Sequence, residues 1–354
     1  MRAARYYGPG DVRVEEVPEP ETRKGQVKIK LVCGSDLHAF HAPFPESITP
    51  TLTNPHYVTG ETLPVTLGHE FSGIITEVGE GVDTGRLSKG QNVVVEPLIS
   101  CRENGCGPCS ADHRNVCPHA SFLGLAGWGG GLAEYITVDE RLVFPLPLNT
   151  PLDVGAMIEP LAVAWHAINR SAFKEGANCL VIGSGPIGLM TLKALQARGA
   201  KWIGVSEPSD QRRGMAVEQQ ASAVFDPRTQ DVVAEVFKAT GGQGADVVFD
   251  CAGVQPSLDL AAKAVRPRGN ITIVAIWTKP AILNMNDITF KEFTMTGIIG
   301  YDHVHAELLE AVAAGKFTGL EKFITKKIKL EDVVEEGIKV LMNDKEQIKI
   351  LVHP

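Results

Sequence analysis

Hydrophobic and polar positions along the chain form two different patterns, and the first covers residues 1–152. Short apolar runs stand between turn residues there, which is typical of β-strands. The clearest runs are residues 27–31, 73–78, 92–95 and 133–138. The sequence therefore predicts a β-rich first domain, and Pro145, Pro147 and Pro151 mark its end.

Beyond residue 152 the apolar runs alternate with longer segments of helical pattern. The expected strands are residues 179–183, 202–205, 245–250 and 270–275, and the expected helices are residues 161–168, 186–196, 211–219 and 257–264. Strands that alternate with helices of this length form a parallel sheet with right-handed crossovers. We therefore expect an α/β domain over residues 153–287. Residues 288–354, with a strand at 294–299 and a helix at 303–314, are expected to return to the first domain.

A glycine-rich turn joins the first strand and helix of the α/β domain. It reads Gly183-Ser-Gly185-Pro186-Ile187-Gly188 and opens the helix directly after an apolar strand. The first glycine allows the tight turn, the second lets a pyrophosphate approach the backbone, and the third lets the helix pack closely. Backbone N–H groups at the start of the helix then face the anion. In this context the turn predicts a doubly wound Rossmann domain that binds a dinucleotide.

An acidic residue, Glu207, ends the next strand of that domain. A carboxylate there accepts hydrogen bonds from the adenosine ribose and repels a 2′-phosphate, so the sequence favours NAD over NADP. Arg212 and Arg213 stand just beyond it and offer a phosphate site, which keeps NADP as the alternative. A glycine turn without a ligand and a surface glutamate are the competing interpretations.

Four of the seven cysteines, Cys101, Cys106, Cys109 and Cys117, stand in one short stretch. The intervening glycines and proline allow tight reversals, so one loop can offer four thiolates to a tetrahedral Zn²⁺. The alternative is a cluster of unligated or disulfide-bonded thiols. The opening residues show no signal peptide, so we expect a cytoplasmic, reducing location that disfavours disulfides. The pattern predicts a closed structural zinc site.

The composition excludes several classes of partner. The chain has 354 residues, of which 44% are hydrophobic and 21% charged, as in an ordinary globular protein. A formal net charge of −8 without any basic block argues against a nucleic-acid surface. No apolar run approaches the ~20 residues of a membrane span. We therefore expect a small-molecule substrate rather than a nucleic acid or a membrane.

Residues suited to a second metal site are scattered along the chain. His69 and Glu70 open a pattern with glycines around and after them, Cys33 precedes Gly-Ser-Asp-Leu-His, and Glu159 precedes a proline. Taken singly, each has a plainer interpretation. His69 would be a core or surface histidine, Cys33 a buried thiol, and Glu159 a carboxylate that stabilises a helix N-terminus.

Together with the cysteine quartet and the glycine-rich turn, these segments resemble the zinc-containing medium-chain alcohol and polyol dehydrogenases, in the same order and over the whole chain. The segment at 54–70, with those at 127–134 and 159–166, is most similar to the (R,R)-2,3-butanediol dehydrogenases. The resemblance implies a Rossmann domain inserted in a β-rich GroES-like catalytic domain. It also implies NAD, two zinc ions per chain, and a homodimer or homotetramer formed through the edge of the nucleotide sheet, near residues 282–285.

The resemblance also assigns roles to the scattered residues. It implies Cys33, His69 and Glu159 as ligands of a catalytic zinc, and Glu70 as a further ligand or a close neighbour. The quartet then holds the structural zinc.

Ser35 and His38, which follow Cys33 in the sequence, match the proton relay of that family. An alcohol loses its proton near neutral pH only if its oxygen is strongly polarised, and a zinc ion with an open position does this. The relay then carries the proton to solvent while hydride moves to the nicotinamide.

The function that the resemblance implies is hydride transfer between NAD and a small vicinal diol or α-hydroxyketone, such as 2,3-butanediol and acetoin. A sorbitol-type polyol dehydrogenase and an L-threonine dehydrogenase are the alternatives. A zinc-free quinone reductase is disfavoured because all three catalytic ligands are present. Only Leu31 and Val32 separate Cys33 from the preceding strand, whereas relatives carry a longer segment. Because ~1 Å of misplacement can cost ~100-fold in rate, a catalytically impaired NAD-binding relative is a further alternative.

Overall fold

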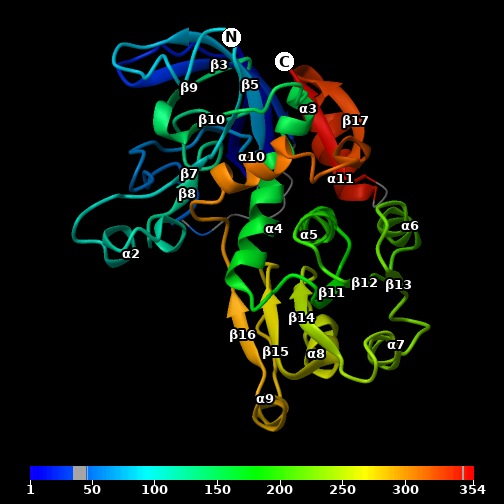
Figure 1. The fold of residues 1–354 in the computed structure, drawn as a ribbon. Helices are drawn as coiled ribbons and strands as arrows, with labels where there is room; N and C mark the ends of the chain where they lie inside the picture. The colour runs from blue at the N-terminus through cyan, green and yellow to red at the C-terminus, as the bar shows by residue number, and fades with distance from the viewer. Residues whose placement is uncertain (35–44, 46, 345–346) are drawn as a thin grey trace. The chain divides into compact units, whose positions relative to one another are not determined.

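The structure is a computed structural model and describes residues 1–34, 45, 47–344 and 347–354 (Figure 1). The chain divides into two compact units. Unit 1 comprises Met1–Glu159, His305–Ala314 and Leu320–Pro354, and unit 2 comprises Pro160–Val304 and Gly315–Gly319. Unit 1 thus contains both ends of the chain, and unit 2 is an insertion within it. The expected domain limits, 152/153 and 287/288, lie earlier in the chain than these divisions.

The strands of unit 1 build a mixed sheet. In order across the sheet they are β10 (Val143–Pro145), β6 (Asn92–Val95), β5 (Phe71–Val78), β3 (Gln26–Gly34), β18 (Lys349–His353) and β17 (Ile324–Lys329), with β9 (Tyr135–Asp139) also paired to β3. A smaller sheet has the order β2 (Asp11–Glu16), β1 (Arg2–Gly8), β4 (Val65–Thr66), and β7 (Leu98–Ile99) pairs with β8 (Ser121–Phe122). The β-rich first domain predicted from the sequence is therefore confirmed.

Strand β3 lies at the centre of this sheet. Val27, Ile29 and Leu31 alternate with lysines and are buried, as expected for a strand with one core-facing side. The strand then continues beyond the predicted range to Gly34. There Cys33 lies opposite Phe71 of β5 and Val352 of β18. The residues that immediately precede Ser35 are thus part of the sheet.

Among the residues that the structure describes, the helices of unit 1 are short. They are α2 (Gly107–Ser110), α3 (Leu152–Gly155), α10 (His305–Ala313) and α11 (Lys339–Asn343), with 3₁₀ turns at Arg114–Val116, Glu140–Leu142, Leu320–Phe323 and Leu330–Asp332 and a π-helical turn at Val333–Ile338. Helix α4 (Ile158–Arg170) begins in unit 1 and continues into unit 2. No helix among the described residues is long and apolar enough to cross a membrane.

Unit 2 contains a parallel sheet. In order across the sheet the strands are β13 (Ala223–Phe225), β12 (Trp202–Ser206), β11 (Asn178–Ile182), β14 (Ala245–Asp250), β15 (Val265–Ile273) and β16 (Thr294–Gly297). The connecting helices are α5 (Pro186–Ala197), α6 (Asp210–Glu218), α7 (Val232–Ala239), α8 (Gln255–Ala264) and α9 (Met285–Lys291). With the strands numbered along the chain, the spatial order is 3-2-1-4-5-6, which is that of the Rossmann fold. The predicted doubly wound domain is confirmed.

Two details of the edge of this sheet differ from expectation. The edge strand is β16, which pairs with β15, so residues 294–297 belong to unit 2 and not to the returning segment. The prediction of an edge strand near residues 282–285 is wrong. Asn284 caps helix α9 there, because its side chain accepts a hydrogen bond from the backbone N–H of Asn286 at 3.1 Å.

Candidate functional site

Three potential metal ligands, His69, Glu70 and Glu159, come together in unit 1. One donor atom from each lies within 4.8 Å of the other two. His69 and Glu70 occupy the turn that connects β4 to β5, and Glu159 lies in the first turn of α4. Glu159 is only 4% exposed. One imidazole and two carboxylates at this spacing suit a divalent cation such as Zn²⁺.

A buried lysine holds Glu70 in this group. Lys349 of β18, 5% exposed, forms an ion pair with the carboxylate of Glu70. The backbone of Glu70 is also fixed, because its carbonyl accepts a hydrogen bond from the N–H of Gly34 at 2.8 Å. A side chain on Gly34 would strike both partners, since its Cβ would lie 2.8 Å from Oε2 of Glu70 and closer still to Lys349. Lys349 was not predicted as a site residue, because nothing in the sequence connects it to a residue so far away.

Cys33 is not among the three donors that lie within 4.8 Å of one another, and its role as a zinc ligand stays a prediction. Its Sγ donates a hydrogen bond to the carbonyl of Gly34 at 2.9 Å, and the residue is fully buried in β3. A Cβ added to Gly68 would lie 2.8 Å from this Sγ, and one added to Gly131 would lie 2.6 Å from it. The thiol therefore packs against these two glycines. Ser35 and His38 lie outside the described residues.

The predicted zinc quartet also comes together. The four sulfur atoms of Cys101, Cys106, Cys109 and Cys117 lie within 4.8 Å of one another. Individual Sγ–Sγ distances are 3.5, 3.7 and 3.8 Å. Sulfur atoms 2.3 Å from a tetrahedral zinc lie about 3.8 Å apart, whereas a disulfide bond needs about 2 Å. The arrangement fits four thiolate ligands.

Buried charges anchor the cysteine loop to the rest of unit 1. Arg114, between the third and fourth cysteines, donates from Nη2 to Oε1 of Glu96 at 3.0 Å. The other oxygen of Glu96 lies 3.3 Å from Nδ1 of His305, at the start of α10. Glu96 is 3% exposed and needs these partners, because an uncompensated buried charge is strongly destabilising.

The glycine-rich turn in unit 2 has the geometry of a phosphate-binding loop. Gly183 has φ = 90°, a conformation that favours glycine, and a Cβ on Gly188 would collide with the carbonyl of Gly183. Gly185 caps α5, which has Pro186 in its first turn. The predicted residues Pro186, Ile187 and Gly188 therefore form the first turn of that helix.

The acid at the end of β12 faces this turn. Glu207 is 4% exposed, and its carboxylate accepts hydrogen bonds from the N–H groups of Ser184 and Ser209, each at 2.8 Å. The carboxylate is thus held beside the glycine-rich loop. A Cβ on Gly185 would lie 3.8 Å from Nη1 of Arg212, so this guanidinium also lies at the loop.

The second arginine, Arg213, is occupied by other groups. Its Nη1 donates to the carbonyls of Glu207 and Pro208 at 2.8 Å, and its Nη2 pairs with Asp210 and with Asp226. A hydrogen bond from Arg228 holds the pKa of the Asp226 carboxyl below its usual range. These contacts favour a structural role for Arg213 over phosphate binding.

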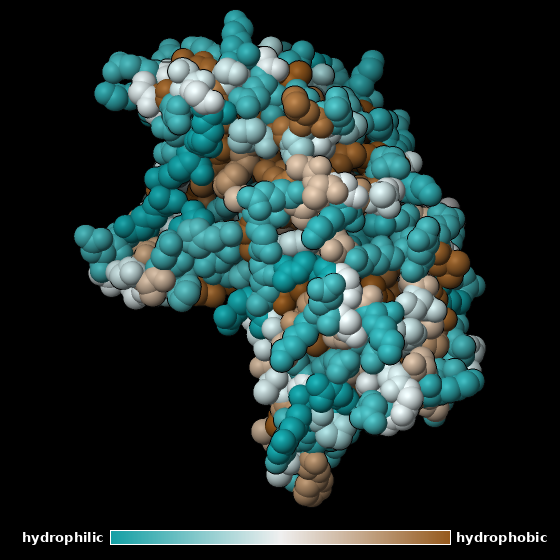
Figure 2. Space-filling view, in the orientation of Figure 1, coloured by the Kyte–Doolittle hydropathy of each residue, from teal (hydrophilic) through white to brown (hydrophobic). Residues whose placement is uncertain are grey.

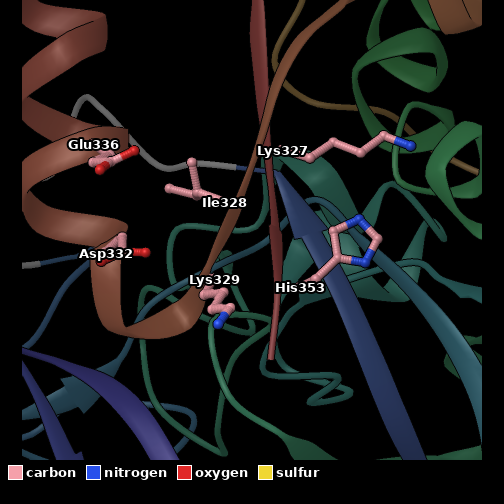
Figure 3. Close-up of a pocket in the computed structure, with 6 residues that line it drawn as sticks. All are labelled: Lys327, Ile328, Lys329, Asp332, Glu336 and His353. Carbon is pink, nitrogen blue, oxygen red and sulfur yellow. The ribbon is translucent and has the colours of Figure 1, made fainter.

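A surface depression of about 360 Å³ lies elsewhere on unit 1 (Figure 3). It is lined by Lys327, Ile328, Lys329, Asp332, Glu336 and His353. Figure 3 shows Glu336 on the π-helical turn, Asp332 at the end of the 3₁₀ turn before it, and Lys327 and His353 on the other side of the strand. Both of these bases contact Asp153 of α3, His353 at 3.1 Å and Lys327 at 2.5 Å. None of the candidate ligands lines this depression.

Comparison with known proteins identifies the family. Residues 24–148 match the alcohol dehydrogenase GroES-like domain, and residues 186–314 match the zinc-binding dehydrogenase domain. The chain belongs to the zinc-containing medium-chain dehydrogenase family. It is therefore an oxidoreductase, as the resemblance of its motifs predicted.

The chain is similar to dehydrogenases from several bacteria. The (R,R)-butanediol dehydrogenase of Neisseria gonorrhoeae is 44% identical over 361 residues, which span 100% of this chain and 99% of that protein. The crystal structure of 2R,3R-butanediol dehydrogenase from Bacillus subtilis has a TM-score of 0.91 and 42% identity, covering 100% of this chain and 99% of the other. A zinc-binding dehydrogenase from Sinorhizobium meliloti bound to NADP has a TM-score of 0.86 and 29% identity, with 100% and 99% coverage.

Proposed function

We propose that this medium-chain dehydrogenase oxidises a small vicinal diol to the α-hydroxyketone, with 2,3-butanediol and acetoin as the pair, and transfers the hydride to NAD. The proposal rests on one observation. The donor atoms of His69, Glu70 and Glu159 lie close together in a chain that matches butanediol dehydrogenases over its full length. Family membership alone would leave the substrate open, because a few pocket contacts of ~1–3 kcal/mol each decide it.

The residues of the His69 centre (His69, Glu70 and Glu159) fit a divalent metal. A bound zinc ion would supply Lewis acidity that polarises the substrate oxygen. The chain's own part is to fix the ligands: the β4–β5 turn orients His69, the start of α4 orients Glu159, and Lys349 holds the Glu70 carboxylate. Ser35 and His38 are proposed to carry the hydroxyl proton to solvent. The quartet is proposed to hold the second, structural zinc.

For the cofactor we propose NAD rather than NADP. In this fold the adenosine ribose of a dinucleotide is recognised at the position that the Glu207 carboxylate occupies. A 2′-phosphate at that position would be repelled by the negative charge of the carboxylate. Arg213 is engaged by two carbonyl groups and two carboxylates. Arg212 stays available beside the loop and is proposed to contact the pyrophosphate.

We further propose a cytoplasmic homodimer or homotetramer. Cytoplasmic reducing conditions would keep the quartet as thiolates. Association through the edge of the unit 2 sheet is supported by β16 and by exposed apolar side chains beside it. Those side chains are Ile282, Met285, Phe290, Met295 and Ile299. In Figure 2 hydrophobic groups are visible at the end of unit 2 where Figure 1 places α9.

The test compares (R,R)-2,3-butanediol, sorbitol and L-threonine by NADH formation, with zinc content measured on the same sample. Butanediol as the best substrate with two zinc ions per chain is expected. Sorbitol or threonine as the best substrate would contradict the proposed substrate while leaving the reaction class intact. NAD binding without any turnover would instead favour the impaired relative. NADP as the better cofactor would contradict the role of Glu207.

A further inference from the structure

A small loop of unit 1, residues 56–61, leads to an inference about substrate binding. Its two ends are joined, because the N–H of His56 donates to the carbonyl of Glu61 at 2.9 Å. Within it, the N–H of Gly60 donates to the carbonyl of His56 at 2.8 Å, and the N–H of Val58 donates to Nδ1 of the same histidine at 3.3 Å. A loop closed by its own contacts is compact, so this bridging loop (residues 56–61) holds its shape as one piece.

Tyr57 attaches the bridging loop to the cysteine loop. Its ring stacks on the ring of His119, with centroids 3.7 Å apart and planes 12° apart. Its hydroxyl donates a hydrogen bond to Oε1 of Glu103 at 2.9 Å. Glu103 stands between the first two cysteines of the quartet, and the N–H of His119 donates to Sγ of Cys117 at 3.4 Å. Tyr57 therefore contacts the cysteine loop near both of its ends, and the separation of these two points depends on the quartet being closed.

A different part of the bridging loop holds the glycine-rich turn at residues 124–131. The hydroxyl of Thr59 donates to the carbonyl of Ala126 at 2.6 Å, and Oε1 of Glu61 accepts a hydrogen bond from the N–H of Trp128 at 2.9 Å. Trp128 has φ = 55°, which is uncommon for a residue with a side chain. Such a conformation persists only where the surroundings fix it, so the bond to Glu61 helps to keep the turn in its shape.

The turn at residues 124–131 packs against the backbone that precedes His69. The N–H of Gly131 donates to the carbonyl of Gly68 at 2.7 Å, and a Cβ on Gly124 would collide with the same carbonyl. The turn therefore borders the His69 centre. Contacts thus run without a break from the cysteine quartet, through the bridging loop, to the residue next to a proposed metal ligand.

We propose that Tyr57 is a positioning residue for substrate binding: it docks the bridging loop on the cysteine loop and so holds the turn at residues 124–131 beside the His69 centre. The affinity for the diol then depends on the closed quartet. This rests on the proposed function, since it assumes a diol that binds at the His69 centre. The ligands of that centre lie on other segments, so the loss of this support should change KM and leave kcat nearly unchanged.

The first experiment measures steady-state oxidation of (R,R)-2,3-butanediol by the full-length enzyme and by Tyr57→Ala. The KM for the diol should rise about tenfold, while kcat and the KM for NAD stay within about twofold. Tyr57→Phe keeps the stacked ring and loses only the hydroxyl, so it should raise the KM about twofold to threefold. An unchanged KM for the diol in Tyr57→Ala, or a loss confined to kcat, overturns the proposal.

The matched control is Tyr7→Ala in β1. Tyr7 makes the same kinds of contact, since its hydroxyl donates to Oε1 of Glu15 at 2.8 Å and the guanidinium of Arg13 lies 4.3 Å from its ring centroid. Both partners belong to β2, so the variant loses comparable contacts elsewhere in unit 1. Its KM for the diol should not change. An equal rise of KM in Tyr7→Ala and Tyr57→Ala would reflect a general loosening of unit 1 and overturns the proposal.

Hydrogen exchange followed by mass spectrometry gives a readout that needs no turnover. In Tyr57→Ala the amides of residues 56–61 and 124–131 should exchange about tenfold faster, because local opening costs less without the attachment, while those of β3 stay unchanged. Cys109→Ser, measured at low temperature, should accelerate the same amides. Adding Tyr57→Ala to Cys109→Ser should then have no further effect, because both changes break one connection. Additive effects overturn the proposal.

The results separate this proposal from the proposed function. If the unaltered enzyme prefers sorbitol or L-threonine, the proposed substrate fails, and the exchange measurement still decides whether Tyr57 supports the turn at residues 124–131. If the diol is the best substrate but exchange in that turn is the same in Tyr57→Ala as in the unaltered enzyme, only the role of Tyr57 fails.

Discussion

The two candidate metal centres of unit 1 are built in opposite ways. The cysteine quartet is local, because all four ligands come from residues 101–117 and one loop brings them together. The His69 centre is assembled from distant segments, with Glu159 in α4 and the supporting Lys349 in the last strand. A local site is fixed by spacing, whereas a long-range site depends on the register of the whole sheet. For this reason the quartet can be predicted from spacing alone, whereas the donors of the His69 centre can be found together only in the folded chain.

The largest effect is expected from removing a ligand of the long-range centre. Glu159→Gln should lower kcat/KM by at least ~1,000-fold, because the metal contributes several kcal/mol of transition-state stabilisation. Zinc should fall from two per chain to one while the melting temperature changes little. The matched control is Glu310→Gln on α10, an exposed acid. Retained activity in Glu159→Gln would remove this residue from the centre.

The opposite pattern is expected for the local centre. Cys109→Ser should also remove one zinc ion, but the main loss should be in stability, with a melting temperature lower by on the order of 10 °C. The catalytic zinc and kcat should persist at low temperature. Differential scanning calorimetry together with elemental analysis distinguishes the two variants. An unchanged melting temperature would show that the loop needs no metal.

The link between the loop and the rest of unit 1 should also matter. Arg114→Met leaves Glu96 buried with one fewer partner, so the free energy of unfolding should fall by about 3–5 kcal/mol. The double variant Arg114→Met, Glu96→Gln removes the charge as well and should recover part of that loss. Urea titration measures both. Equal stability of the single variant and the unaltered protein would contradict the anchoring role.

The smallest effect is expected at Lys349, which positions a ligand of the reactive centre. Lys349→Ala should weaken metal retention about tenfold, as is usual when a ligand loses its supporting partner. Competition with a chelator measures this, and Lys349→Arg should retain most of the affinity. The quartet zinc serves as the internal reference, because its release should not change. Equal retention in all three proteins would show that Glu70 needs no partner.

Much of the fold was predictable, because its signals are local. The glycine-rich turn after an apolar strand and the alternation of strands and helices led to the Rossmann domain. The prediction of an edge strand near residues 282–285 was wrong, and the reason is also local. The helix-capping role of Asn284 competes with an apolar run that looked extended. Strand β16 was identified as a strand but assigned to the wrong unit, since only its pairing with β15 decides that.

The sequence by itself predicted the family, the Rossmann domain and the clustering of the four cysteines, because each of these rests on motifs whose residues are near one another in the chain. Only the tertiary structure decided which donors meet at the His69 centre. Sheet pairing places Lys349 against Glu70 and holds Cys33 opposite Phe71, and no local pattern reports such register. The physical reason is that hydrogen bonding between strands fixes side-chain positions across hundreds of residues, whereas composition and spacing act over a few.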